Sequence, residues 1–164
     1  MFSDSKVRTC LWFDRSGEDA ARFYVSLLPD SAIESVFRPD AAKPPLVVTF
    51  HLAGVPYMIL NGGPHHKLSP AASICVQTDD QAETDRLWDA LVEGGKPVAC
   101  GWLEDRFGVS WQITPKRLLE LMMDKDEARA GRVMQAMMQM VKIDIAALEN
   151  AAGALSARTD TSER

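Results

Sequence analysis

The sequence predicts an α+β fold built from two tandem βαβββ units and a set of C-terminal helices. The segment that begins with a strand at Ser73 and runs into a helix repeats a segment that begins at Thr9, at an offset of 64 residues. The strand that follows Gly108 repeats the strand that follows Gly54, at an offset of 54 residues. Beyond residue 115 the strand pattern ends and apolar residues recur at helical spacing.

The first unit is expected to span about residues 7–61. Ser16 with Asp19 three residues later is typical of a helix N-terminus, where side-chain oxygens bind free backbone amides. A proline-rich stretch at residues 38–45 is expected to form a loop before a β-prone run. The predicted elements are strands at residues 7–13, 32–37, 46–52 and 56–60 and a helix at residues 16–28.

The second unit is expected to span about residues 71–114, with the same order of elements. Asp80 and Glu83 have the spacing of a capping box, and Gly94 with Gly95 is a helix-ending signal. The predicted elements are strands at residues 72–77, 97–99, 101–104 and 109–114 and a helix at residues 80–93. The two units together form a predicted domain over residues 1–115.

A helical extension is predicted over residues 116–153, with helices at residues 117–123, 127–141 and 145–152. Its methionine-rich stretch has two interpretations. The side chains pack as ordinary apolar residues against the sheets or a subunit partner, or they form an adaptable lid, because methionine fills irregular surfaces. Residues 154–164 are small and polar, and are expected to be a disordered tail.

The composition limits the classes of partner. The chain is 46% hydrophobic and 25% charged, as in soluble globular proteins. A net charge of −5 without a basic run disfavours nucleic-acid binding. No apolar stretch reaches the length of a membrane span, no signal peptide is visible, and three widely spaced cysteines do not suggest a disulfide framework. We therefore expect a cytoplasmic protein with neither nucleic acid nor membrane as partner.

The chain resembles the vicinal oxygen chelate superfamily, also called the glyoxalase/bleomycin-resistance/dioxygenase superfamily, in its PhnB-like branch. The residues that carry the resemblance are 11–14, 18–24, 60–63, 79–83, 88–91, 94–95, 100–105 and 107–113, spread over about residues 8–115. The resemblance implies that each unit curls into a half-barrel, that paired half-barrels form a cup, and that the protein is a homodimer. Sequences of this branch often carry the label 3-demethylubiquinone-9 3-methyltransferase.

The resemblance also implies four positions for a divalent metal: Thr9, Met58, Ser73 and Gln112. Only Gln112 is a plausible ligand, because such ions prefer carboxylate or imidazole donors. We therefore expect no bound metal and no other cofactor. The methyltransferase label has little support either, because no glycine-rich turn of the kind that cradles a nucleotide-like cofactor joins a strand to a helix.

What remains is a cup for a small molecule, lined by apolar side chains with a few neutral polar groups. Its predicted lining is Thr9, Leu11, Phe13, His51, Met58, Leu60, Ser73, Cys75, Trp102, Ser110 and Gln112. Two alternatives stay open for this set. The side chains could instead fill a closed core, and His51 is either a structural histidine or a general base.

Three functions follow from this pattern. The first is metal-independent binding of a small apolar or aromatic molecule, with no catalytic residue identified. The second is a metal-dependent lyase, isomerase or dioxygenase that uses Gln112, with His51 and an unrecognised carboxylate. The third is a dimeric interaction module whose methionine-rich helices contact a partner.

Overall fold

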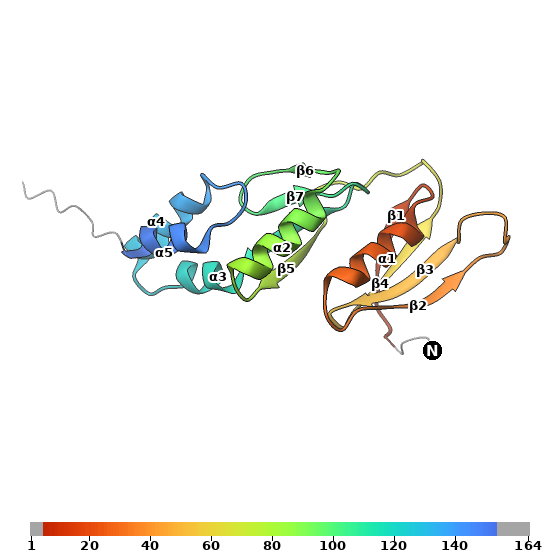
Figure 1. The fold of residues 1–164 in the computed structure, drawn as a ribbon, viewed down its shortest axis with the longest axis horizontal. Helices are drawn as coiled ribbons and strands as arrows, with labels where there is room; N and C mark the ends of the chain where they lie inside the picture. Colours follow the sequence, from red (N-terminus) through yellow and green to blue (C-terminus); the bar gives the residue numbers. More distant parts are fainter. Residues whose placement is uncertain (1–4, 154–164) are drawn as a thin grey trace, which may run out of the picture. The chain divides into compact units, whose positions relative to one another are not determined.

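The computed structural model describes residues 5–153, and the structural statements below refer to these residues. The chain forms two compact units (Figure 1). The first consists of the chain up to Ala72 together with Phe107–Val109, and the second of Ser73–Arg106 and the chain from Ser110 onward. Each unit contains one four-stranded mixed sheet and its own helix, as the repeat predicts.

The first sheet has the strand order β1-β4-β3-β2. Its strands are β1 (Thr9–Phe13), β2 (Ala32–Phe37), β3 (Val47–Leu52) and β4 (Val55–Asn61). β1 runs parallel to β4, and the other neighbours are antiparallel. Helix α1 (Gly17–Leu27) lies across one face of this sheet (Figure 1). The fully buried side chains between them include Val48, Phe50, Ile59 and Tyr24.

The second sheet has the corresponding order β5-β8-β7-β6. Its strands are β5 (Ser73–Thr78), β6 (Lys96–Pro97), β7 (Trp102–Glu104) and β8 (Ser110–Pro115). Helix α2 (Gln81–Val92) covers the face that carries Thr78, whose hydroxyl lies 2.6 Å from that of Thr84. The indole of Trp111 is buried on the same side and donates a hydrogen bond of 2.8 Å to Asp105.

The two helix N-termini differ in how they are capped. The predicted capping box of α2 is confirmed: Asp80 accepts from the amide of Glu83 at 2.8 Å, and Glu83 accepts from the amide of Asp79 at 2.7 Å. The predicted cap at Ser16 is wrong, because its side chain makes no capping hydrogen bond. The side chain of Asn61 accepts from the Gly17 amide instead, at 3.0 Å, so a residue distant in sequence caps α1.

The C-terminal extension consists of α3 (Lys116–Met122), α4 (Glu127–Met137) and α5 (Ile145–Gly153), and it belongs to the second unit. It has a small core of its own, made by Leu118, Leu121, Val133, Ile143, Leu148 and Ala152. The prediction that the middle helix reaches residue 141 is wrong. The carbonyls of Met140 and Val141 accept hydrogen bonds of 2.8 Å from the amides of Cys100 and Gly101, which holds this segment outside a helix.

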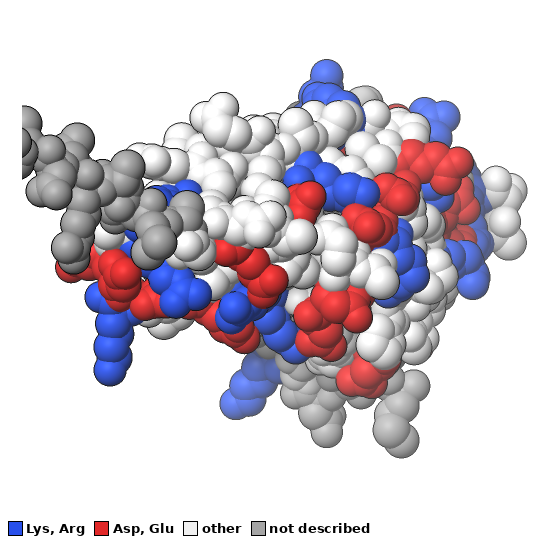
Figure 2. All heavy atoms as spheres, turned by 60° about the vertical axis from the view of Figure 1, so that its left-hand side comes forward, with Lys and Arg blue, Asp and Glu red and all other residues white. Residues whose placement is uncertain are grey.

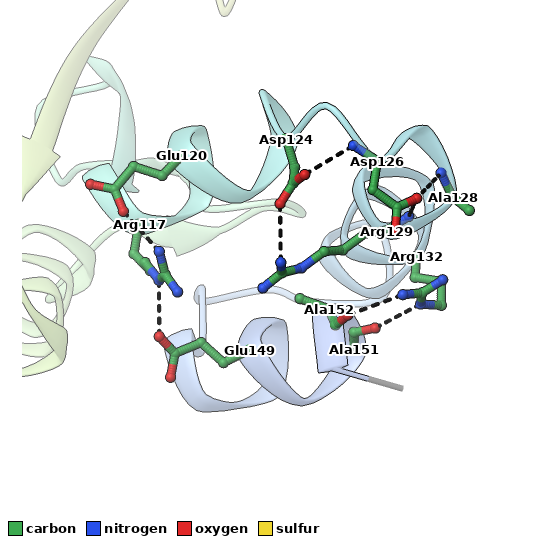
Figure 3. Close-up of polar contacts among 10 residues, drawn as sticks. All are labelled: Arg117, Glu120, Asp124, Asp126, Ala128, Arg129, Arg132, Glu149, Ala151 and Ala152. Atoms are coloured by element: carbon green, nitrogen blue, oxygen red, sulfur yellow. Dashed lines mark hydrogen bonds and ion pairs between the residues drawn. The ribbon is translucent and has the colours of Figure 1, made fainter. Parts of the chain in front are cut away.

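Polar contacts tie the three helices together (Figure 3). Arg117 binds Glu120 and Glu149, at 3.0 and 2.9 Å. Arg132 of α4 donates to two carbonyls at the end of α5, those of Ala151 and Ala152, at 3.0 Å each. The guanidinium thus joins α4 to the last described turn of α5.

The methionines of the extension divide between its core and its surface. Met122, Met137 and Met140 pack against the extension's own core, a neighbour that neither of the two interpretations named. Met123 and Met138 are exposed, at 83% and 61%.

No helix among residues 5–153 is long and apolar enough to cross a membrane. Acidic and basic side chains are interspersed on the face that Figure 2 shows. The predicted disordered tail, residues 154–164, lies outside the described residues.

Candidate functional site

Strand register decides which side chains of the first sheet point away from α1. We call the face opposite the helix the open face. In β1, Leu11 is paired with the fully buried Ile59 and therefore lies on the helix side. Cys10, paired with Met58, lies on the open face. The open face of the first sheet carries Cys10, Trp12, Ser35, Val47, Thr49, His51, Met58 and Leu60.

This register corrects part of the predicted lining. Thr9, Leu11 and Phe13 share the helix side, opposite Met58 and Leu60, and the aliphatic and aromatic side chains among them are buried. The cause is the length of the strand-to-helix connection. Two residues separate β1 from the N-cap Ser16, whereas a single residue separates β5 from the N-cap Asp80. The N-cap positions of α1 and α2 are 64 residues apart, but equivalent positions of β1 and β5 are 65 residues apart. This difference of one residue reverses the predicted face of every β1 side chain.

In the second unit, all predicted residues lie on the open face. Ser73 is paired with Ser110, Cys75 with Gln112, and Gln112 with Trp102. The Gln112 side-chain amide donates a hydrogen bond of 2.8 Å to the Ser73 hydroxyl. The Cys75 thiol lies 3.8 Å from the Thr114 hydroxyl on the same face. This surface therefore combines neutral hydrogen-bonding groups with an indole.

The corrected register also changes the positions implied for a metal. The counterpart of Ser73 in the first unit is Arg8, not Thr9, and the counterpart of Gln112 is Met58. A guanidinium, a thioether, a hydroxyl and an amide do not suit a divalent ion, which prefers carboxylate or imidazole donors. Among residues 5–153, no group of three His, Cys, Asp or Glu side chains is arranged to hold a metal. The residues present therefore do not fit the metal that the fold implies.

A charged cluster on the first sheet is not evident from the sequence pattern. Arg8, just before β1, pairs with Glu34 of β2 at 2.6 Å, and the same carboxylate lies 3.4 Å from Nδ1 of His51. Glu34 is the carboxylate near His51 that the sequence could not identify. It sits where the pairing of β2 with β3 shifts between Ile33 and Ser35, and strand alternation alone does not reveal such a shift.

Burial changes the acidity of two groups in the first unit. Burial raises the pKa of the Cys10 thiol, and a backbone hydrogen bond at Leu60 opposes this in part. Burial also raises the pKa of the Tyr57 phenol. Both groups therefore stay protonated at neutral pH, and Cys10 is a poor nucleophile there.

Residues 5–153 form a hollow in each unit. The first, of about 440 Å³, is bordered by the proline-rich loop and the connection from β1 to α1. The second, of about 740 Å³, lies between the start of α2 and the extension, where acidic side chains meet Arg117 and Lys142. Neither includes a residue of the predicted cup lining, so the lining residues are found on sheet faces and not in these hollows.

The family model and the most similar solved structures point to one family. The family model described as 3-demethylubiquinone-9 3-methyltransferase matches residues 5–114. A PhnB protein from Bacillus cereus is 30% identical, with a TM-score of 0.63 over 68% of this chain and 99% of that one. A protein from Pseudomonas aeruginosa, at 22% identity and a TM-score of 0.58, covers 68% and 98%.

A more distant fold match is the fosfomycin resistance protein FosX from Mesorhizobium loti. It has 13% identity and a TM-score of 0.50 over 69% of this chain and 92% of that one. Among proteins with curated descriptions, none matches the chain. These matches leave out about a third of the chain, and the family model ends before α3.

Proposed function

Because the chain belongs to the 3-demethylubiquinone-9 3-methyltransferase family, the PhnB-like branch of the vicinal oxygen chelate superfamily, we propose that it binds a small apolar or aromatic molecule on the open faces of its sheets, without a metal ion. The hydrogen bond between Gln112 and Ser73 carries the proposal. At two positions where the superfamily would place metal ligands, an amide and a hydroxyl bind each other. Both groups can still accept further hydrogen bonds from an organic ligand.

The setting of this pair supports an organic ligand. Trp102 and Cys75 flank Gln112 on the neighbouring strands, so an aromatic face and a thiol border the polar pair. Small-molecule sites combine apolar lining with a few placed polar groups in this way. Ser110, paired with Ser73, adds a second hydroxyl to the same face.

Methyl transfer, which the family description names, has no matching structural element among residues 5–153. The connection from β5 to α2 is Asp79 and Asp80, and that from β1 to α1 is Asp14, Arg15 and Ser16. Neither is a glycine-rich turn whose amides could cradle a nucleotide-like cofactor. We therefore propose binding and not methyl transfer as the activity of the open faces.

The first test is elemental analysis of protein purified without chelator, together with thermal unfolding in the presence of added zinc, nickel or manganese. We expect no stoichiometric metal in the purified protein. We also expect no stabilisation by added metal, whereas an ion that bound the folded state would raise its stability. About one metal ion per chain, lost in Gln112→Leu, would contradict the proposal and favour the metal-dependent enzyme.

The second test is a thermal-shift and calorimetric screen with aromatic and aliphatic probes. For a probe that binds, Gln112→Leu should weaken the affinity by about tenfold, the equivalent of one hydrogen bond. Gln135→Leu, which removes an exposed amide from α4, is the matched control and should leave the affinity unchanged. If no probe binds, or if both variants behave alike, the proposed site is wrong.

A further inference from the structure

The open face of the first sheet has a chemical gradient along its strands. At one end lie the charged side chains Arg8, Glu34 and His51. The middle row is neutral and the far row is apolar. The middle row is Cys10, Met58, Thr49 and Ser35, and the far row is Trp12, Leu60, Val47 and Phe37. Side chains on one face recur about every 6.6 Å along a strand, so the gradient extends over roughly 13 Å.

The charged end is a cluster held by Glu34. One carboxylate oxygen is 2.6 Å from Nη2 of Arg8, and the other is 3.4 Å from Nδ1 of His51. Nη1 of Arg8 donates to the Tyr57 carbonyl at 3.3 Å. The side chains of Arg8 and Glu34 are only 13% and 7% exposed, while that of His51 is 29% exposed. A near-buried ion pair thus has a partly accessible imidazole beside it.

A purely structural sheet face has little need of such a cluster. Removing two charges from water is costly, and apolar residues of similar volume often stabilise a protein as well or better. The Glu34 carboxylate contacts only one nitrogen of Arg8 and one nitrogen of His51. A guanidinium has five N–H donors, so Arg8 retains donors for a ligand. Glu34 lies on the Nδ1 side of the imidazole, so Nε2 of His51 can donate to a ligand carboxylate when the ring carries both protons. Glu34 orients both groups in the way that supporting carboxylates fix binding residues.

We propose that Arg8 and His51, oriented by Glu34, bind the carboxylate of a monocarboxylic acid whose apolar body lies along the neutral and apolar rows. The inference rests on the proposed function, namely that the open faces bind ligands, and it names the ligand class for the first sheet. Arginine suits a carboxylate because its planar N–H groups match the two oxygens. The length of the gradient fits an acid of about the size of cinnamate or octanoate.

The experiment compares each acid with its uncharged amide of the same shape: cinnamate with cinnamamide, and octanoate with octanamide. Affinities are measured by calorimetry or ligand-observed NMR on the full chain. The wild-type protein should bind the acids at least about tenfold more tightly than the amides, the range expected for a hydrogen bond to a charged group. Equal binding of acid and amide would overturn the inference and leave the proposed function standing.

Removing only one partner of a buried ion pair is strongly destabilising, so the main variant is the double substitution R8Q/E34Q. It should reduce the acid-to-amide ratio to within about twofold, because the charge that selects the acid is gone. The control R117Q/E149Q also removes one positive and one negative charge, from an ion pair of 2.9 Å in the extension. It should keep the acid-to-amide ratio of the wild-type protein. A preference that persists in R8Q/E34Q would show that the acid is bound elsewhere.

His51→Gln tests the cluster without removing the ion pair, and serves if R8Q/E34Q does not fold. It should lower the affinity for the acids and leave that for the amides unchanged. An unchanged affinity for the acids would remove His51 from the site and overturn the inference as stated. If neither acids nor amides bind the wild-type protein, the inference fails together with the proposed function for this sheet.

Discussion

Gly17 fixes where α1 meets the first sheet. A Cβ atom at this residue would lie 2.2 Å from Cγ2 of Ile59 and 2.7 Å from Oδ1 of Asn61. Both distances are far below van der Waals contact, and Ile59 is fully buried, so the backbone itself packs against the sheet. The same approach brings the Gly17 amide within hydrogen-bond reach of Asn61, which caps the helix.

Gly17→Ala should therefore destabilise the protein by about 1–3 kcal/mol, the usual cost of forcing extra volume into a packed core. Gly131→Ala is the matched control, because Gly131 lies inside α4 and its added Cβ would meet no atom within 4 Å beyond the backbone of its own helix. It should stabilise the protein by about 0.5–1 kcal/mol, since alanine favours helices over glycine. Urea unfolding measures both, and equal effects at the two sites would contradict the close-packing argument.

At the scale of elements, the segment between α4 and α5 attaches the extension to the second unit. Gln81 of α2 binds this segment twice, donating to the Ile143 carbonyl at 3.1 Å and accepting from the Ile145 amide at 2.8 Å. Lys142 lies 2.8 Å from Asp85 and 3.6 Å from Asp89. The extension is therefore held by hydrogen bonds from the Gln81 side chain to its backbone and by an ion pair that depends on pH.

The Lys142–Asp85 pair gives a pH-dependent prediction. Hydrogen bonds from Lys142, and then from Gln81, lower the pKa of Asp85, while the hydrogen bond to Asp85 raises the pKa of Lys142. A lowered carboxyl pKa contributes stability above the ordinary value of about 3.9, which is lost as the pH falls through the folded value. A raised ammonium pKa contributes stability below about 10.4, which is lost as the pH rises through the folded value.

Lys142→Met should accordingly lower the free energy of unfolding near pH 7, by less than about 1 kcal/mol because both side chains are partly exposed. The loss should shrink as the pH falls towards about 2, through the lowered folded pKa of Asp85, because a protonated carboxyl no longer pairs with Lys142. Lys125→Met, at an exposed lysine between α3 and α4, is the control. Chemical unfolding at both pH values measures the difference, and a loss of the same size at pH 2 would assign the effect to packing instead of charge.

At the scale of the molecule, the chain combines a family domain with a helical addition. The family model ends at residue 114, and the relatives from Bacillus cereus and Pseudomonas aeruginosa cover 68% of the chain. The extension has its own apolar core and still leaves Met134 and Met138 exposed at 40% and 61%. Exposed methionines one helical turn apart are suited to contact with another molecule.

We expect a homodimer in solution, with twice the chain mass of 18.1 kDa. Light scattering across micromolar concentrations measures it, and the mass of a single chain throughout would contradict it. The double substitution Met134→Glu with Met138→Glu separates two arrangements. A shift to the monomer would place the contact on α4, in line with the interaction-module hypothesis, whereas an unchanged dimer would exclude this surface as the interface.

Much of the fold could be predicted because it depends on local chemistry. The Asp80–Glu83 cap, the order of the strands along the chain and the turn at Gly54 follow from residues close in sequence. In the second unit the same reasoning put Ser73 and Gln112 on one face, and the register agrees. In the first unit the predicted face of β1 is wrong by one residue. The connection between β1 and Ser16 contains one residue more than the corresponding connection in the second unit.

The sequence by itself determined the repeat and the element types, since each depends on residue identity and short-range spacing. Only the tertiary structure decided that Asn61 caps α1, that Arg8 takes the position expected of Thr9, and that Glu34 lies beside His51. These contacts join residues far apart in the chain through strand register and a shift in pairing. A change of one residue in register reverses every side chain of a strand, and short-range patterns do not fix that register.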